Sequence, residues 1–147
     1  MVRVLVVDDH PLMRELLVDI LSADPDILVV GTACNGLEAV ECVQANEVDV
    51  ITMDLRMPGM DGVEATRRIV AKHDCAVVAV HGSWTNEDSQ NVRRVLEAGA
   101  VVAVEKSLGA GGANGEEFAE RLRWEVSKAA RERLAEEKQD RVGGAVQ

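Results

Sequence analysis

Three aspartates and one lysine of this chain are placed where they could carry out chemistry together. Asp8, Asp9 and Asp54 each come at or just after the end of an apolar run, and Lys106 follows a third run. Carboxylates gathered at one point repel one another unless a cation neutralises them. A hard cation such as Mg²⁺ takes oxygen ligands and keeps several waters. Asp54 could then attack a phosphoryl donor, while the metal and Lys106 neutralise the transferring oxygens.

The protein ligands of such a metal are predicted from the same stretch of sequence. Asp9, Asp54 and the backbone carbonyl of Arg56 could bind Mg²⁺ directly, and Asp8 could bind it through a water molecule. A hydroxyl from the polar loop after residue 80 would hydrogen-bond one phosphoryl oxygen. The protein would contribute positioning and electrostatics, with little covalent chemistry beyond the attack itself.

Apolar runs that end in these residues are predicted to be buried parallel strands. In an open α/β sheet, ligands bind at the carboxyl ends of the strands, which explains why separate runs could deliver their acids to one site. Five strands are expected, at residues 3–7, 27–32, 48–53, 76–80 and 101–104.

Amphipathic helices are predicted between these strands. Pro11 favours the start of the first, Gly62 lies at the start of the third, and Gly99 closes the fourth. Five alternations of strand and helix predict an α/β fold, with a doubly wound parallel sheet and helices on both faces. The chain contains no repeat and no second hydrophobic core, so one domain is expected.

The last helix is predicted over residues 116–137, and residues 138–147 are expected to form a flexible tail after a domain of residues 1–137. Trp124 lies two residues after Leu122, about 200° further around the helix, and should face away from its apolar stripe. The Gly-rich stretch 106–115 has no Gly-Lys-Ser/Thr ending, so a connector is favoured over a phosphate loop.

Composition limits the classes of function. The chain has 147 residues and a formal charge of -10, and no cluster of basic residues offsets that charge. Direct nucleic-acid binding is therefore not expected. Three cysteines fit neither a disulfide framework nor a zinc site. No signal peptide and no apolar stretch long enough to cross a membrane are seen, so a cytoplasmic protein is expected.

The motifs together resemble the receiver domain of bacterial two-component response regulators. They are Asp8-Asp9-His10-Pro11, Asp54 before Met57-Pro58-Gly59-Met60-Asp61-Gly62, and Gly99-Ala100 ahead of Lys106. The resemblance covers roughly residues 2–130 and implies the flavodoxin-like receiver fold. The Asp-His-Pro and Gly-Val-Glu-Ala-Thr-Arg-Arg stretches are most similar to receivers of helix-turn-helix regulators. Residues 24–32 and the long last helix resemble receivers of chemotaxis methylesterases.

The resemblance also implies roles for these residues. Asp54 would accept a phosphoryl group from a histidine kinase, Asp8 and Asp9 would help to bind Mg²⁺, and Lys106 would contact the phosphoryl group. The phosphorylated domain would change the surface that it shows to a partner. Such a domain catalyses only its own phosphorylation and dephosphorylation, and no output enzyme is expected within these residues.

The sequence departs from the family pattern in strands four and five. The family usually has Ser or Thr at the end of strand four, and His81, Gly82 and Ser83 are the alternatives here; we favour Ser83. His81 could also sense phosphorylation, and its ordinary pKa near 6.5 makes pH sensitivity possible. Strand five usually carries an aromatic residue, and residues 101–104 have none.

Trp84 and Trp124 are the candidates for partner contact, because tryptophan is enriched at interfaces. A downstream protein would then bind through the last two helices, and a homodimer through the last helix is compatible with an outward Trp124. Three other functions stay open. They are an interaction module that works without phosphorylation, the receiver part of a larger regulator, and a phosphohydrolase with an Asp-x-Asp loop, which the adjacent Asp8-Asp9 pair disfavours.

Overall fold

The computed structural model describes residues 1–82, 86–107 and 113–145. Five strands alternate with five helices in this part of the chain, and the predicted alternation is confirmed. The elements are β1 (Val2–Val7), α1 (Pro11–Ser22), β2 (Ile27–Ala33), α2 (Gly36–Ala45), β3 (Val50–Asp54), α3 (Gly62–Lys72), β4 (Ala76–His81), α4 (Asn86–Ala98), β5 (Val102–Glu105) and α5 (Ala113–Ala145).

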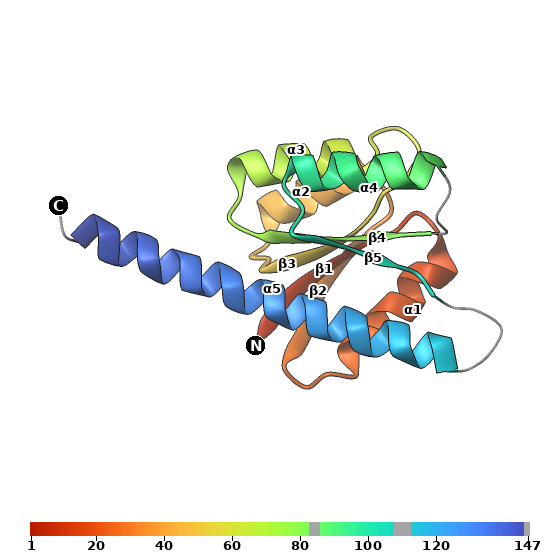
Figure 1. Cartoon of the computed structure of the whole chain (residues 1–147), viewed down its shortest axis with the longest axis horizontal. Helices are drawn as coiled ribbons and strands as arrows, with labels where there is room; N and C mark the ends of the chain where they lie inside the picture. Colours follow the sequence, from red (N-terminus) through yellow and green to blue (C-terminus); the bar gives the residue numbers. More distant parts are fainter. Residues whose placement is uncertain (83–85, 108–112, 146–147) are drawn as a thin grey trace.

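All five strands form one parallel sheet with the order β2-β1-β3-β4-β5. Helices α1 and α5 cover one face of the sheet, and α2, α3 and α4 cover the other (Figure 1). This is the predicted doubly wound, three-layer arrangement. The winding changes direction between β1 and β3, and the crevice beside such a switch point is where open α/β sheets bind ligands.

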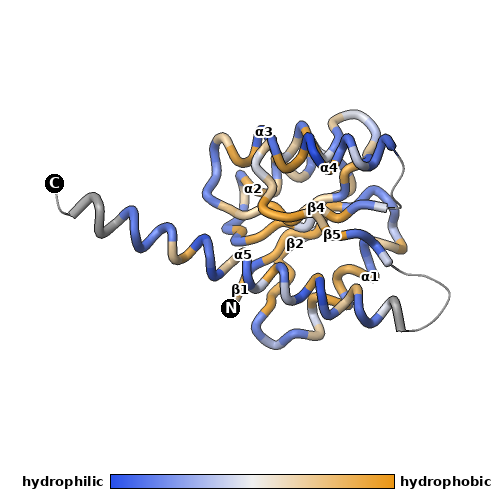
Figure 2. Tube along the Cα trace, viewed as in Figure 1, coloured by the Kyte–Doolittle hydropathy of each residue, from blue (hydrophilic) through white to orange (hydrophobic). Residues whose placement is uncertain are grey.

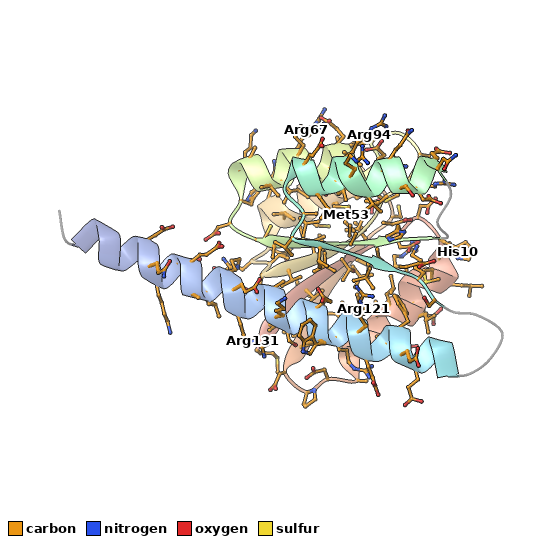
Figure 3. All side chains as sticks on the ribbon, in the orientation of Figure 1. His10, Met53, Arg67, Arg94, Arg121 and Arg131 are labelled. Atoms are coloured by element: carbon orange, nitrogen blue, oxygen red, sulfur yellow. The ribbon has the colours of Figure 1, made fainter. Side chains whose placement is uncertain are left out.

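Aliphatic side chains fill the two layers between sheet and helices. Alternate residues of a strand face opposite sides, so Val4 and Val6 enter the core beneath α1 and α5, while Leu5 and Val7 enter the core beneath α2 and α3. Figure 3 shows Met53 of β3 between the sheet and its upper helices. Burial on both faces explains why the strands are continuous apolar runs.

Three helices that follow the ligand-binding edge begin with a side-chain cap. His10 Nδ1, Asn35 Oδ1 and Asp61 Oδ1 accept hydrogen bonds from the third amide of α1, α2 and α3 respectively. Each bond satisfies an amide that has no partner within the helix. The caps fix where each helix starts, and therefore the shape of the loops that carry the acidic residues.

Helix α5 is longer at both ends than the predicted range 116–137, because it runs from Ala113 to Ala145. Residues 138–145 continue the helix, which corrects the tail predicted from residue 138. Phe118, Leu122 and Val126 are buried in the core. The end of α5 extends past the sheet (Figure 1), and its residues are mainly hydrophilic (Figure 2). Within the described chain, no helix has the length and apolarity required to cross a bilayer.

Candidate functional site

The carboxylates of Asp8, Asp9 and Asp54 meet at the carboxyl ends of β1 and β3. One carboxylate oxygen from each of the three aspartates lies within 4.8 Å of those of the other two. Asp8 is fully buried and accepts a hydrogen bond from the amide of His10 at 2.9 Å, Asp54 is 7% exposed, and Asp9 is exposed. The predicted gathering of the three acids is therefore present, with Asp9 on the solvent side.

Lys106 lies directly after β5 and reaches the same point. Its Nζ lies 3.0 Å from Asp8 Oδ2 and 3.5 Å from Asp54 Oδ1. Its amide donates to the carbonyl of His81 at 2.8 Å, which fixes the backbone of the lysine against the end of β4. The ammonium group thus bridges two of the three acids.

The negative charge at this site exceeds what one lysine can neutralise. The pKa of the Asp54 carboxyl is raised to about 7: burial raises it, the charge of Lys106 opposes the rise, and the charges of Asp8 and Asp9 add to it. A carboxyl so perturbed binds a proton or a cation readily. Three carboxylates facing a shared point are the donor set of a hard divalent ion, so Mg²⁺ fits the residues present.

These side chains open into a small cavity of about 260 Å³, large enough for a hydrated ion beside a phosphoryl group. Its lining combines four acids with two cations and two histidines. The lining residues are Asp8, Asp9, His10, Asp54, Leu55, Arg56, His81, Gly82, Asp88 and Lys106.

The end of β4 contributes His81 and Gly82 to the cavity lining. His81 is the last residue of β4 and is 2% exposed, and its Nδ1 donates to the carbonyl of Gly82 at 2.9 Å. The imidazole therefore occupies the strand end, where we considered a hydroxyl. Ser83, which we favoured for that role, lies outside the described residues.

Arg56 and Asp88 form an ion pair in the wall of the cavity, with Arg56 Nη2 2.7 Å from Asp88 Oδ1. From the sequence, a role is predicted only for the backbone carbonyl of Arg56, and none for Asp88. The one available signal for Asp88 was its place in the acidic first turn of α4, a common feature of helix starts.

Trp124 lies away from this cavity, on the outer face of α5. Its side chain is 55% exposed, as predicted, and Lys128 Nζ lies 5.0 Å from the centre of its ring. Trp84, the second candidate for partner contact, lies outside the described residues.

The family model of the response regulator receiver domain matches residues 4–112. The chain belongs to this family. The receiver is also 47% identical to a protein-glutamate methylesterase/protein-glutamine glutaminase of Geobacter metallireducens, over 79% of this chain and 33% of that protein. It spans about a third of the length of the curated relatives that it matches.

Two solved receiver structures are similar to this one. The response regulator domain of Thermotoga maritima CheB has a TM-score of 0.78 and 39% identity, over 89% of this chain and 97% of that chain. The REC domain of AraT, a response regulator from Geobacillus stearothermophilus, has a TM-score of 0.74 and 26% identity, over 94% and 99%. The predicted family and fold are confirmed, and this receiver is a phosphoacceptor domain of two-component signal transduction.

Proposed function

We propose that Asp54 is the residue of this receiver that accepts the phosphoryl group. The ion pair of Lys106 with Asp54, inside a cluster of acids, carries this proposal. An oxygen of the Asp54 carboxylate attacks phosphorus, the bond to the imidazole nitrogen of a histidine kinase breaks, and that nitrogen keeps the electron pair. The product is an acyl phosphate on Asp54.

The other residues hold the reactants in place. Asp9, Asp54 and the backbone carbonyl of Arg56 would bind Mg²⁺, with Asp8 helping through water. When bound, the metal supplies positive charge for the transferring oxygens. Lys106 turns from Asp8 and Asp54 toward the phosphoryl group. His81 and Gly82 line the cavity at the position of the strand-four hydroxyl, and Ser83 stays a predicted donor.

Phosphorylation would act by changing the surface offered to a cytoplasmic partner. We assign the receiver unit to residues 1–137, with α4 and α5 as the output face. Trp124 supports that assignment, because large exposed aromatic side chains are enriched in interfaces. The same face is open to a second copy of the chain.

A second candidate is that this receiver is the regulatory part of a longer methylesterase. The curated relatives are about three times as long as the matched segment and bear that enzymatic name. In that case phosphorylation of the receiver would control an output domain in the same protein, and the receiver itself would contribute no catalysis to its reaction.

Mass spectrometry after incubation with acetyl phosphate and Mg²⁺ tests the proposed acceptor. The wild-type chain should gain one phosphoryl group, and Asp54→Asn should gain none. Asp61→Asn is the matched control, because asparagine keeps the α3 cap and the variant should still be labelled. A wild-type chain that stays unlabelled, or a label that survives in Asp54→Asn, contradicts the proposal.

A further inference from the structure

The Arg56–Asp88 ion pair joins the loop that follows the acceptor strand to the start of α4. Arg56 Nη2 lies 2.7 Å from Asp88 Oδ1 and 3.5 Å from Glu87 Oε2. The side chain of Arg56 is 52% exposed, whereas that of Asp88 is 6% exposed. A buried carboxylate depends strongly on the cation beside it, because water cannot take over that role.

This ion pair lies close to the proposed acceptor. Arg56 is two residues after Asp54, and Arg56, Asp54 and Asp88 all line the same cavity. The cationic side chains of that lining are Lys106 and Arg56, and each is paired with an aspartate in the structure described. A phosphoryl group on Asp54 would therefore appear beside two cations that already have anionic partners.

We propose that Arg56 exchanges its partner when Asp54 is phosphorylated. Its guanidinium breaks the ion pair with Asp88 and binds the phosphoryl oxygens instead, which loosens the first turn of α4. This inference rests on the proposed function. A phosphoryl group brings about 1.5–2 negative charges and three acceptor oxygens. The planar guanidinium of arginine fits such oxygens in pairs. Once Arg56 has turned, Asp88 loses this ion pair, and the first turn of α4 loses a link to the acceptor loop.

The chemistry of β5 makes this route important in this chain. Of its four residues, Val102, Ala103 and Val104 have no polar or aromatic side chain that could respond to a change in charge, and Glu105 is the last residue of the strand. Arg56 and Asp88, by contrast, connect the acceptor loop to an exposed helix through charged groups alone. The state of Asp54 would thus reach the α4 surface because the phosphoryl group competes with the carboxylates of Asp88 and Glu87 for one guanidinium.

Competition predicts opposite effects at the two ends of the ion pair. Binding at the acceptor and release of Asp88 are linked, so a change that favours one favours the other. Asp88→Asn removes the nearer, buried competing anion and should tighten the binding of beryllofluoride, a phosphoryl mimic. Arg56→Met removes the cation that the mimic would gain and should weaken binding. If the ion pair had a purely structural role, both substitutions would weaken the binding of beryllofluoride alike.

Two measurements on the full chain test the exchange. With Mg²⁺ present, titration with beryllofluoride should give an affinity about three- to tenfold higher for Asp88→Asn and lower by a similar factor for Arg56→Met. Hydrogen exchange should show the amides of residues 86–92 exchanging about tenfold faster when wild type binds the mimic. In Asp88→Asn these amides should exchange fast already without it.

Arg67→Met is the matched control, because Arg67 pairs with Glu64 on the outer face of α3 and projects away from the sheet (Figure 3). It should behave as wild type. Arg56→Lys keeps the charge without the planar fork and should bind beryllofluoride with intermediate affinity. That result would support the change of partner, because this variant leaves Asp88 unaltered. The inference is overturned if the affinity for beryllofluoride falls in both Asp88→Asn and Arg56→Met. It is also overturned if the hydrogen exchange of the α4 amides does not change when wild type binds the mimic.

The result also separates this inference from the proposed function. Suppose that the wild-type chain binds beryllofluoride and takes a phosphoryl group on Asp54, but the hydrogen exchange of the α4 amides stays the same. This result overturns the Arg56–Asp88 route alone. A wild-type chain that takes neither overturns the assignment of the acceptor and, with it, the inference that depends on it.

Discussion

The pKa of the Asp54 carboxyl, raised to about 7, makes the protonation of one residue part of the folding equilibrium. In the unfolded chain the same carboxyl has an ordinary pKa of about 3.9. Between these values the folded protein holds a proton that the unfolded protein has lost. The free energy of unfolding therefore falls as the pH rises from about 4 to about 7, for the metal-free protein.

Asp54→Asn should remove this contribution. Without divalent metal at pH 8, the variant should be more stable than wild type by about 1–3 kcal/mol, because it buries no charge beside Asp8 and Asp9. At pH 4.5 the two should be nearly equal. Added Mg²⁺ should stabilise wild type at pH 8 more than the variant. Urea unfolding in chelator and in Mg²⁺ at both pH values measures this, and a variant less stable at pH 8 in chelator contradicts it.

The convergence of Asp8, Asp9, Asp54 and Lys106 was predictable, because parallel strands bring their carboxyl ends to one edge. The partner of the Arg56 guanidinium was not. A long flexible side chain can reach in several directions, and strand periodicity does not say which helix start lies within its reach. Only the close approach of α4 to the acceptor loop places Asp88 within reach of Arg56.

At the scale of whole elements, helix α3 begins in direct contact with the acceptor strand. Gly62 is its first residue, and its amide donates to the carbonyl of Leu55 at 3.1 Å. A Cβ added at Gly62 would lie 2.0 Å from the carbonyl oxygen of Asp54. Backbone atoms cannot turn aside as a side chain can, so the glycine is required for this close approach.

Gly62→Ala should separate α3 from β3 and disturb Asp54. We expect a loss of about 2–4 kcal/mol in the free energy of unfolding and slower phosphorylation by acetyl phosphate. Gly115→Ala is the matched control, since a Cβ there meets nothing within 4 Å and alanine favours a helix by up to about 1 kcal/mol. Urea unfolding compares the two, and equal stability of both variants would exclude the steric explanation.

The order and type of the elements could be predicted because apolar runs and amphipathic stretches alternate cleanly. The end of α5 could not. Its buried apolar stripe stops at Ala130, so the pattern that predicted the helix fades before the helix does. The residues that follow are good helix formers, such as Leu134 and Glu136, and they continue the helix without a core to pack against.

At the scale of the whole molecule, Arg133 ties the projecting part of α5 to the sheet at the edge opposite the acidic cavity. Its side chain is 12% exposed and contacts Asp49 Oδ1 at 2.8 Å, the carbonyl of Asp74 at 2.7 Å and Glu137 at 2.9 Å. The pKa of Asp49 lies below its usual value: burial raises it, but hydrogen bonds from Arg3 and the charge of Arg133 outweigh that effect. Asp49 therefore stays ionised and holds both arginines.

Arg133→Met should release the last turns of α5, because a helix as short as residues 134–145 is marginal in water without tertiary support. We expect a loss of about 2–4 kcal/mol in the free energy of unfolding, since Asp49 keeps Arg3 but loses one buried partner. Helical circular dichroism should fall, and trypsin should cut the end of α5 faster. Arg131→Met, an exposed neighbour on the same helix (Figure 3), should change none of these. If both variants behave alike, the helix end is stabilised by its own residues, and its direction is independent of the sheet.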